Sequence, residues 1–83
     1  MMTWLLVALL VAGPHKMVTV PNVIWLTVPQ AEAKLADAGL KCEVKEVGPH
    51  KAPKGTVFGQ GPKPGTRVMV NYEVQIYVSK GTP

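Results

Sequence analysis

The chain has 83 residues, which is enough for one small domain. Its net charge is +4, with acidic residues interspersed among basic ones and no basic run, so we expect no nucleic-acid partner. A mild basic excess suits anionic polymers such as a cell wall or a lipid surface. The single cysteine, Cys42, excludes an internal disulfide and a multi-cysteine zinc site.

The first 13 residues are unlike the rest of the chain. Residues 1–12 contain no charged side chain. They are too few for a membrane-spanning helix of about 20 residues, but they match the hydrophobic region of a signal peptide, although the usual preceding Lys or Arg is missing. We expect segment 1–13 to be a secretion signal or a membrane anchor. Two alternatives stay open: a longer membrane helix truncated by the start position, and an N-terminal helix or strand lying on the domain.

Residues 17–24 are expected to be extended. Val18 and Val20 alternate with Thr19, and Pro21 favours extended geometry in the residue before it. Proline has no backbone N–H, so Pro21 cannot occupy a central strand. We expect the folded domain to begin here and to cover residues 17–81.

A capped amphipathic helix is predicted over residues 28–38. Thr27 is a good N-cap, and Gln30 three residues later completes the capping-box pattern. Pro29 falls in the first turn, where its missing N–H costs nothing. Apolar residues recur at helical spacing: Val28, Ala31, Leu35 and Ala38.

The end of this helix is predicted from Gly39. Glycine takes the left-handed conformation that commonly ends a helix, and Leu40 can then fold back on Leu35. A helix of about three turns is marginal alone, so we expect it to pack on a sheet.

Four extended segments follow the helix. They are residues 40–47, 56–60, 67–70 and 73–79. In the second, Val57 and Phe58 are expected to pack, and in the last, alternation predicts that Ser79 points outward. Gly55 and the Pro64-Gly65 pair suit tight turns. These elements predict an α+β fold in which one helix packs on a three-stranded, largely antiparallel sheet.

The assembled residues resemble the PASTA module, a repeat found outside the membrane in bacterial penicillin-binding proteins and serine/threonine kinases. The resemblance covers residues 18–81. It rests on the order and spacing of several segments: Val20-Pro21-Asn22-Val23, the Ala31/Leu35 helix, Ala38-Gly39-Leu40, Pro53 to Val57, Gln60 to Gly65, and Val74 to Gly81. Among the departures, Trp25 stands where the family usually has glycine, and Asn71 replaces the glycine of the last turn.

The resemblance implies an extracytoplasmic, non-catalytic module that binds peptidoglycan or related cell-wall fragments. The alternative is a structural spacer, or a protein-interaction module that docks a membrane or cell-envelope partner through Trp25 and residues 1–13. Localisation would be secreted or membrane-anchored. PASTA modules usually accompany a kinase, a transpeptidase or further copies. Because not every PASTA module binds cell wall, the function does not follow from the fold alone.

Four residues are candidates for ligand binding. Trp25 could stack on a sugar ring or meet another protein; the alternative is that it covers the helix start or the N-terminal segment. Arg67 could clamp a carboxylate of a peptidoglycan stem peptide, or be a solvated charge at a strand end. Lys54 and Gln60 could add donors from turns.

No catalytic set is visible in the sequence. An arrangement of Cys42, His50 and Glu46 can be drawn, but alternation places Cys42 toward the core, where a cysteine behaves as a small apolar residue. Two histidines without suitably spaced carboxylates are too few for a metal site. We therefore expect no enzyme activity, no metal and no cofactor.

Overall fold

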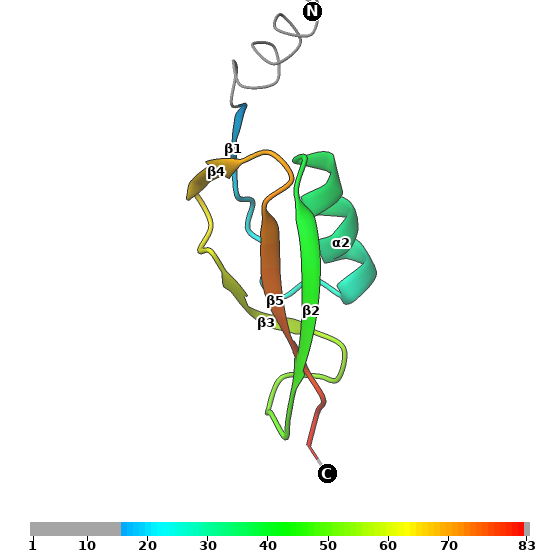
Figure 1. The fold of residues 1–83 in the computed structure, drawn as a ribbon. Helices are drawn as coiled ribbons and strands as arrows, with labels where there is room; N and C mark the ends of the chain where they lie inside the picture. Colours follow the sequence, from blue (N-terminus) through cyan, green and yellow to red (C-terminus); the bar gives the residue numbers. More distant parts are fainter. Residues whose placement is uncertain (1–15, 83) are drawn as a thin grey trace, which may run out of the picture.

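One helix and five strands make up the fold of residues 16–82. A computed structural model describes residues 16–82, and the apolar segment predicted at residues 1–13 lies outside them. The elements are β1 (Met17–Thr19), α2 (Val28–Asp37), β2 (Lys41–Val47), β3 (Val57–Gly61), β4 (Arg67–Met69) and β5 (Glu73–Ser79). Figure 1 shows α2 against the sheet, so the predicted α+β fold is confirmed. Within residues 16–82, no helix has the length and apolarity needed to cross a bilayer.

The main sheet has the strand order β2-β5-β3, and β1 and β4 form a separate antiparallel pair. β3 pairs with β5 antiparallel, whereas β2 pairs with β5 parallel, from Lys41 opposite Glu73 to Val47 opposite Ser79. Two of the three strand pairings are therefore antiparallel. The parallel one was not specified by the sequence pattern, because it joins strands that are far apart in the chain.

Both ends of α2 have the predicted geometry. The Thr27 hydroxyl accepts from the backbone N–H of Gln30, and the Gln30 amide oxygen accepts from the N–H of Thr27. At the other end, the N–H of Leu40 donates to the carbonyl of Leu35 at 2.9 Å, with Gly39 at φ +80°. This is a Schellman ending, and it turns the chain directly into β2.

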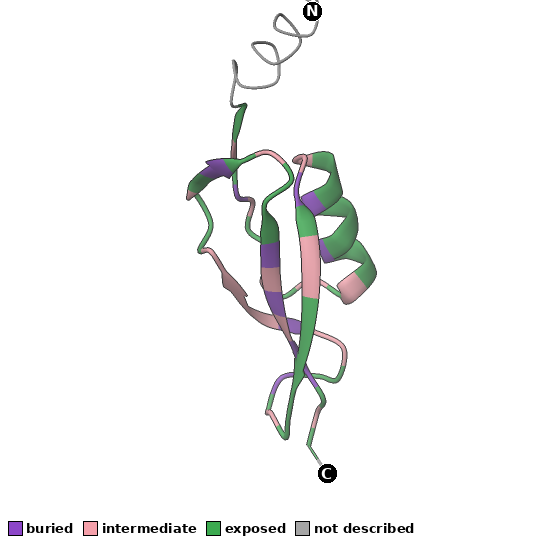
Figure 2. Cartoon of the chain, in the orientation of Figure 1, coloured by how far each residue is buried: buried purple, intermediate pink, exposed green. Residues whose placement is uncertain are grey.

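The core lies between α2, the leading segment (residues 20–26) and one face of the sheet. Its members are mostly aliphatic and form one cluster: Val20, Val23, Ala31, Leu35, Leu40, Val57, Val68, Val74, Ile76 and Val78. Figure 2 shows the buried positions alternating along β5 and confined to one face of α2. The apolar residues that alternate along β5 and those at helical spacing along α2 therefore pack together in one small core, as expected for two amphipathic elements.

β3 is irregular at Phe58. A register shift between Val57 and Gly59 interrupts its pairing with β5. Val57 is fully buried, but Phe58 is only half-buried and stacks on the ring of His50, with centroids 3.8 Å apart. Both residues therefore pack, but against different partners. Val57 joins the core, whereas Phe58, the next residue along the strand, points to the other face and packs on His50 of the loop between β2 and β3 (residues 48–56).

Ser79 differs from the prediction, because it is 2% exposed instead of pointing into solvent. The loop 48–56 folds over the end of β5 and covers it. The Ser79 hydroxyl donates to the carbonyl of Ala52 at 2.7 Å and accepts from the N–H of Gly81 at 2.9 Å. One buried hydroxyl thus ties the loop to the C-terminal segment.

Replacing Gly39 tests the helix ending. Gly39→Val should lower the free energy of unfolding by at least about 1 kcal/mol, since a β-branched residue resists positive φ. The added Cβ would also lie 3.2 Å from Cγ2 of Val70. Gly39→Asn adds the same Cβ but tolerates the left-handed region, so it should cost less. Urea unfolding measures both; equal stability of the valine variant and the wild type would contradict this helix ending.

Removing the Ser79 hydroxyl tests the loop anchor. Ser79→Ala leaves the carbonyl of Ala52 and the N–H of Gly81 without their partner, so stability should fall by about 1–3 kcal/mol. Tyr77→Phe is the matched control on the same strand. It removes a hydroxyl that donates to Gln75 at 3.0 Å on a half-buried site, and should change stability by less than about 0.5 kcal/mol. Thermal unfolding that ranks the two variants the other way would remove Ser79 from this role.

Candidate functional site

The four ligand-binding candidates do not come together in one site. Arg67 is exposed on β4, at the end of the molecule where β4 pairs with β1. Lys54 lies in the loop at the opposite end, where Gly55 donates to the carbonyl of Ser79. Trp25 precedes α2 and is held by β3. Arg67 and Lys54 therefore do not line the same cleft.

The side chain of Gln60 is occupied inside the protein. Its amide oxygen accepts from the N–H of Val23 at 2.9 Å, and its amide nitrogen donates to the carbonyls of Pro21 and Pro62. These bonds hold the leading segment against β3. We therefore give the Gln60 side chain a structural role. The sequence had suggested that it was a donor free to bind a ligand.

Trp25 has an unusual backbone for a large residue. Residues 23–26 form a turn in which the N–H of Leu26 donates to the carbonyl of Val23, and Trp25 takes φ +75°. This third position of a type II turn normally requires glycine or asparagine. The backbone N–H of Trp25 donates to the carbonyl of Val57 at 2.7 Å, which fixes the turn, while the residue stays 70% exposed. The Trp25 ring is therefore exposed and does not belong to the core.

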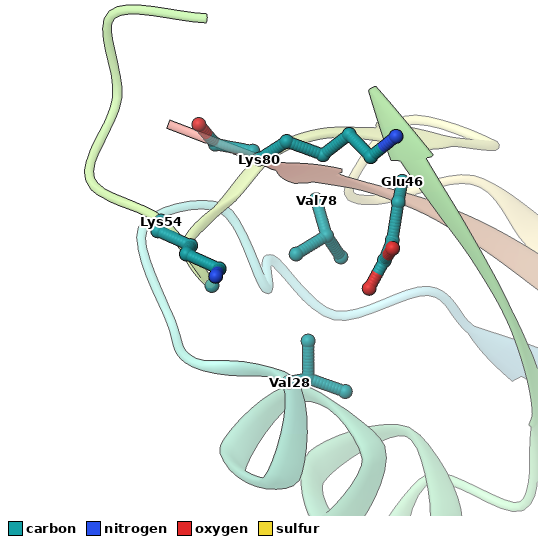
Figure 3. Close-up of a pocket in the computed structure, with 7 residues that line it drawn as sticks. Val28, Glu46, Lys54, Val78 and Lys80 are labelled. Carbon is teal, nitrogen blue, oxygen red and sulfur yellow. The ribbon is translucent and has the colours of Figure 1, made fainter. Parts of the chain in front are cut away.

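Lys54 contributes to an open cleft of about 430 Å³ between the start of α2 and the ends of β2 and β5. Val28 and Val78 form its apolar floor, and Figure 3 shows Lys54, Lys80 and Glu46 placed around them. Gly55 and Ser79 complete the lining. The loop anchor at Ser79 therefore also shapes one wall of this cleft.

The cleft carries charges of both signs that have no partner among the described residues. The ion pair found within residues 16–82 is Lys45–Glu43 at 3.9 Å, outside the cleft. Lys54, Lys80 and Glu46 are exposed and free to meet a ligand. Two ammonium groups and one carboxylate around an apolar floor suit a ligand that has a carboxylate, a donor group and small alkyl groups.

Sequence reasoning missed two charged residues of the cleft, Glu46 and Lys80. Lys80 follows the last strand and is held in place by its backbone N–H, which donates to the carbonyl of Val47 at 2.9 Å. Glu46 lies opposite Val78 only because β2 and β5 are parallel neighbours. No local pattern specifies that pairing, so the sequence carried no signal for this site.

The residues that could have formed a catalytic set are kept apart. Burial raises the pKa of the Cys42 thiol, and the carboxylates of Glu32 and Glu73 raise it further, so the thiol stays protonated and is not an activated nucleophile. His50 stacks on Phe58, and its Nδ1 accepts from the N–H of Ala52. In the described part of the chain, no three His, Cys, Asp or Glu residues are grouped closely enough to hold a metal ion.

Known proteins resemble the chain in sequence, and two solved structures also resemble it in fold. The family model of the PASTA domain matches residues 18–80. A probable serine/threonine-protein kinase of Corynebacterium efficiens is 31% identical over 77 residues, which is 90% of this chain and 12% of the kinase. The extracellular region of the Ser/Thr kinase PrkC from Staphylococcus aureus is 31% identical with a TM-score of 0.71, over 81% of this chain and 24% of that one.

A second solved structure gives the same result. The three-PASTA-domain structure of a Ser/Thr kinase from Staphylococcus aureus is 27% identical with a TM-score of 0.70, over 78% of this chain and 33% of that one. The chain thus spans an eighth of the curated kinase and no more than a third of either solved structure. What the two solved structures share with the chain is the fold of one module. The chain belongs to the PASTA domain family.

Proposed function

We propose that the chain is a non-catalytic, extracytoplasmic module that binds peptidoglycan fragments or related cell-wall peptides. The observation that carries the proposal is the cleft, in which Lys54, Lys80 and Glu46 surround an apolar floor without an ion-pair partner in residues 16–82. The similarity to extracellular regions of kinases supports placement outside the cytoplasm, either secreted or held at the membrane through residues 1–13.

Stem peptides of the cell wall offer groups that this cleft can bind. A carboxylate of the peptide would lie between the ammonium groups of Lys54 and Lys80, and a donor would face Glu46. The methyl group of an alanine would rest on Val28 and Val78. Trp25 lies three residues before Val28, so its exposed ring could stack on an attached sugar. Arg67, at the other end of the molecule, has no part in this contact.

Titration of the labelled protein with soluble muropeptides, followed by amide NMR shifts, tests the proposal. Saturable shifts should cluster at Lys54, Gly55, Lys80 and Trp25. Lys54→Ala should weaken binding by about fivefold, the equivalent of ~1 kcal/mol for an exposed charge.

The matched control for this titration is Lys63→Ala. It removes the same exposed charge from the turn between β3 and β4, which does not line the cleft. Binding should be unchanged. A flat titration of a well-dispersed spectrum, or an equal loss in both variants, would contradict binding in the cleft.

A second function, protein docking, is favoured by one observation. Trp25 combines a left-handed backbone with a largely exposed ring. The conformation costs about 1–2 kcal/mol in a non-glycine residue, and the exposed ring returns little of that through packing. Strain of this kind is retained at sites that bind other molecules more often than elsewhere. The alternative is therefore a spacer or interaction module that docks an envelope protein on Trp25.

Trp25→Gly separates the folding role from the binding role of this residue. Glycine removes ~1–2 kcal/mol of backbone strain, but it loses ~0.5–1 kcal/mol more conformational entropy on folding. The first effect is larger, so the variant should be more stable by about 0.5–1 kcal/mol. Asn71→Gly is the control, because Asn71 also has positive φ (70°) but tolerates it. Its thermal unfolding should be nearly unchanged. Loss of stability in Trp25→Gly would mean that the ring packs in the fold.

A further inference from the structure

β2 is a long sheet edge without a partner among the described residues. It stands at the end of the strand order β2-β5-β3, and its seven residues pair on one side only. The opposite edge of the sheet is covered at its start, where the backbone groups of Val57 bond to Trp25 and Leu26. An open edge of this length is a template for pairing with another strand.

The hydrogen-bonding direction of each β2 residue follows from the ends of the strand. The N–H of Lys41 donates to Tyr72, and the carbonyl of Val47 accepts from Lys80, so both residues direct their backbone toward β5. Alternate residues of a strand point their backbone groups the same way. The N–H and carbonyl groups of Cys42, Val44 and Glu46 therefore face away from β5, and no backbone hydrogen bond from another described segment reaches them.

The side chains of β2 are arranged symmetrically about Val44. Glu43 and Lys45 flank it, with side chains 41% and 46% exposed, and Val44 itself is 38% exposed. One way in which natural proteins protect an open edge is with charged side chains, especially lysine, because like charges directly opposite each other repel a second copy. Here the signs are opposite on the two sides of an exposed apolar residue, so an antiparallel copy would meet attraction instead of repulsion.

From this edge we infer that β2 pairs with β2 of a second copy of this chain, antiparallel and about a two-fold axis at Val44. Val44 then lies opposite its own copy, and Cys42 opposite Glu46, as hydrogen-bonded pairs made of the outward-facing groups. Glu43 lies opposite Lys45 on each side of the axis, in the non-hydrogen-bonded positions where side chains come closest. The two sheets become one continuous sheet with an isologous interface.

Other alignments of the same edge are less favourable. Directly opposite residues must share a face of the sheet, so the axis passes through a residue. An axis at Glu43, Lys45 or Glu46 places like charges opposite each other, which is destabilising. An axis at Cys42 leaves the end of β2 without a partner. Val44 is the position that pairs all seven residues of β2 and matches the charges.

The position of α2 is compatible with this dimer. α2 lies beside the first half of β2, and the second half of the strand extends past the start of the helix (Figure 1). Residues 44–47 are all exposed. About the two-fold axis, the second half of one β2 strand pairs with the first half of the other, beside which α2 lies. The two helices are therefore offset from each other along the sheet. This inference does not depend on the proposed ligand or its cleft.

Charge reversal in the full chain, followed by sedimentation equilibrium, tests the pairing. The wild type should dimerise. Glu43→Lys places two lysine side chains opposite each other on each side of the axis and should weaken the dimer by about tenfold or more. The double variant Glu43→Lys/Lys45→Glu restores opposite charges with the signs exchanged and should restore the dimer. Circular dichroism of all three should be the same, because both side chains are exposed.

Amide hydrogen exchange distinguishes this dimer from association through residues 1–13. Exchange at Cys42, Val44 and Glu46 should slow as the protein concentration rises, whereas Glu43 and Lys45 already bond to β5 and should not change. A monomer at all concentrations, a single charge reversal without effect, or association that leaves the three outward amides unprotected would each overturn the inference.

Discussion

The sheet depends on β5, because β2 and β3 do not pair with each other and are joined only through it. β5 is also the last of these strands in the chain, so the three-stranded sheet cannot form until β5 is present. Its inward residues, Val74, Ile76 and Val78, pack in the core with residues of the helix and of the leading segment. Pairing between strands far apart in the chain raises the contact order, and proteins of high contact order fold more slowly than others of similar stability. It also concentrates the stability of a small core in one strand.

Local features of the fold could be predicted from the sequence because their causes are local. Thr27 and Gln30 satisfy backbone groups within one turn, and Gly39 ends the helix through its own backbone freedom. Alternation along β5 identified the residues that face the core, and the Pro64-Gly65 turn closes with the N–H of Thr66 on the carbonyl of Lys63. These features give the class of fold and the family, since family resemblance consists of their order and spacing.

The rest could not be predicted because it depends on contacts between distant segments. Alternation places Ser79 outward, and only the folded-over loop buries it. Gln60 looks like a free donor until the leading segment arrives beside β3. The same holds for the candidate site: Lys54 could be proposed from its turn, but Glu46 and Lys80 join it through a parallel pairing and a covered strand end. Arg67 was also proposed as a ligand-binding residue, but it lies on β4 and does not line the cleft.

The two ends of the described chain lie at opposite poles of the molecule, and the three strands of the main sheet run along the line between them (Figure 1). Tension applied between those ends would pull β5 along its own length against both neighbours. Its ladder hydrogen bonds would then be loaded together in shear, instead of opening one after another from an end. Resistance to such a load is set by the unfolding rate, not by equilibrium stability. A module with a thin core can in this way be mechanically strong along one direction.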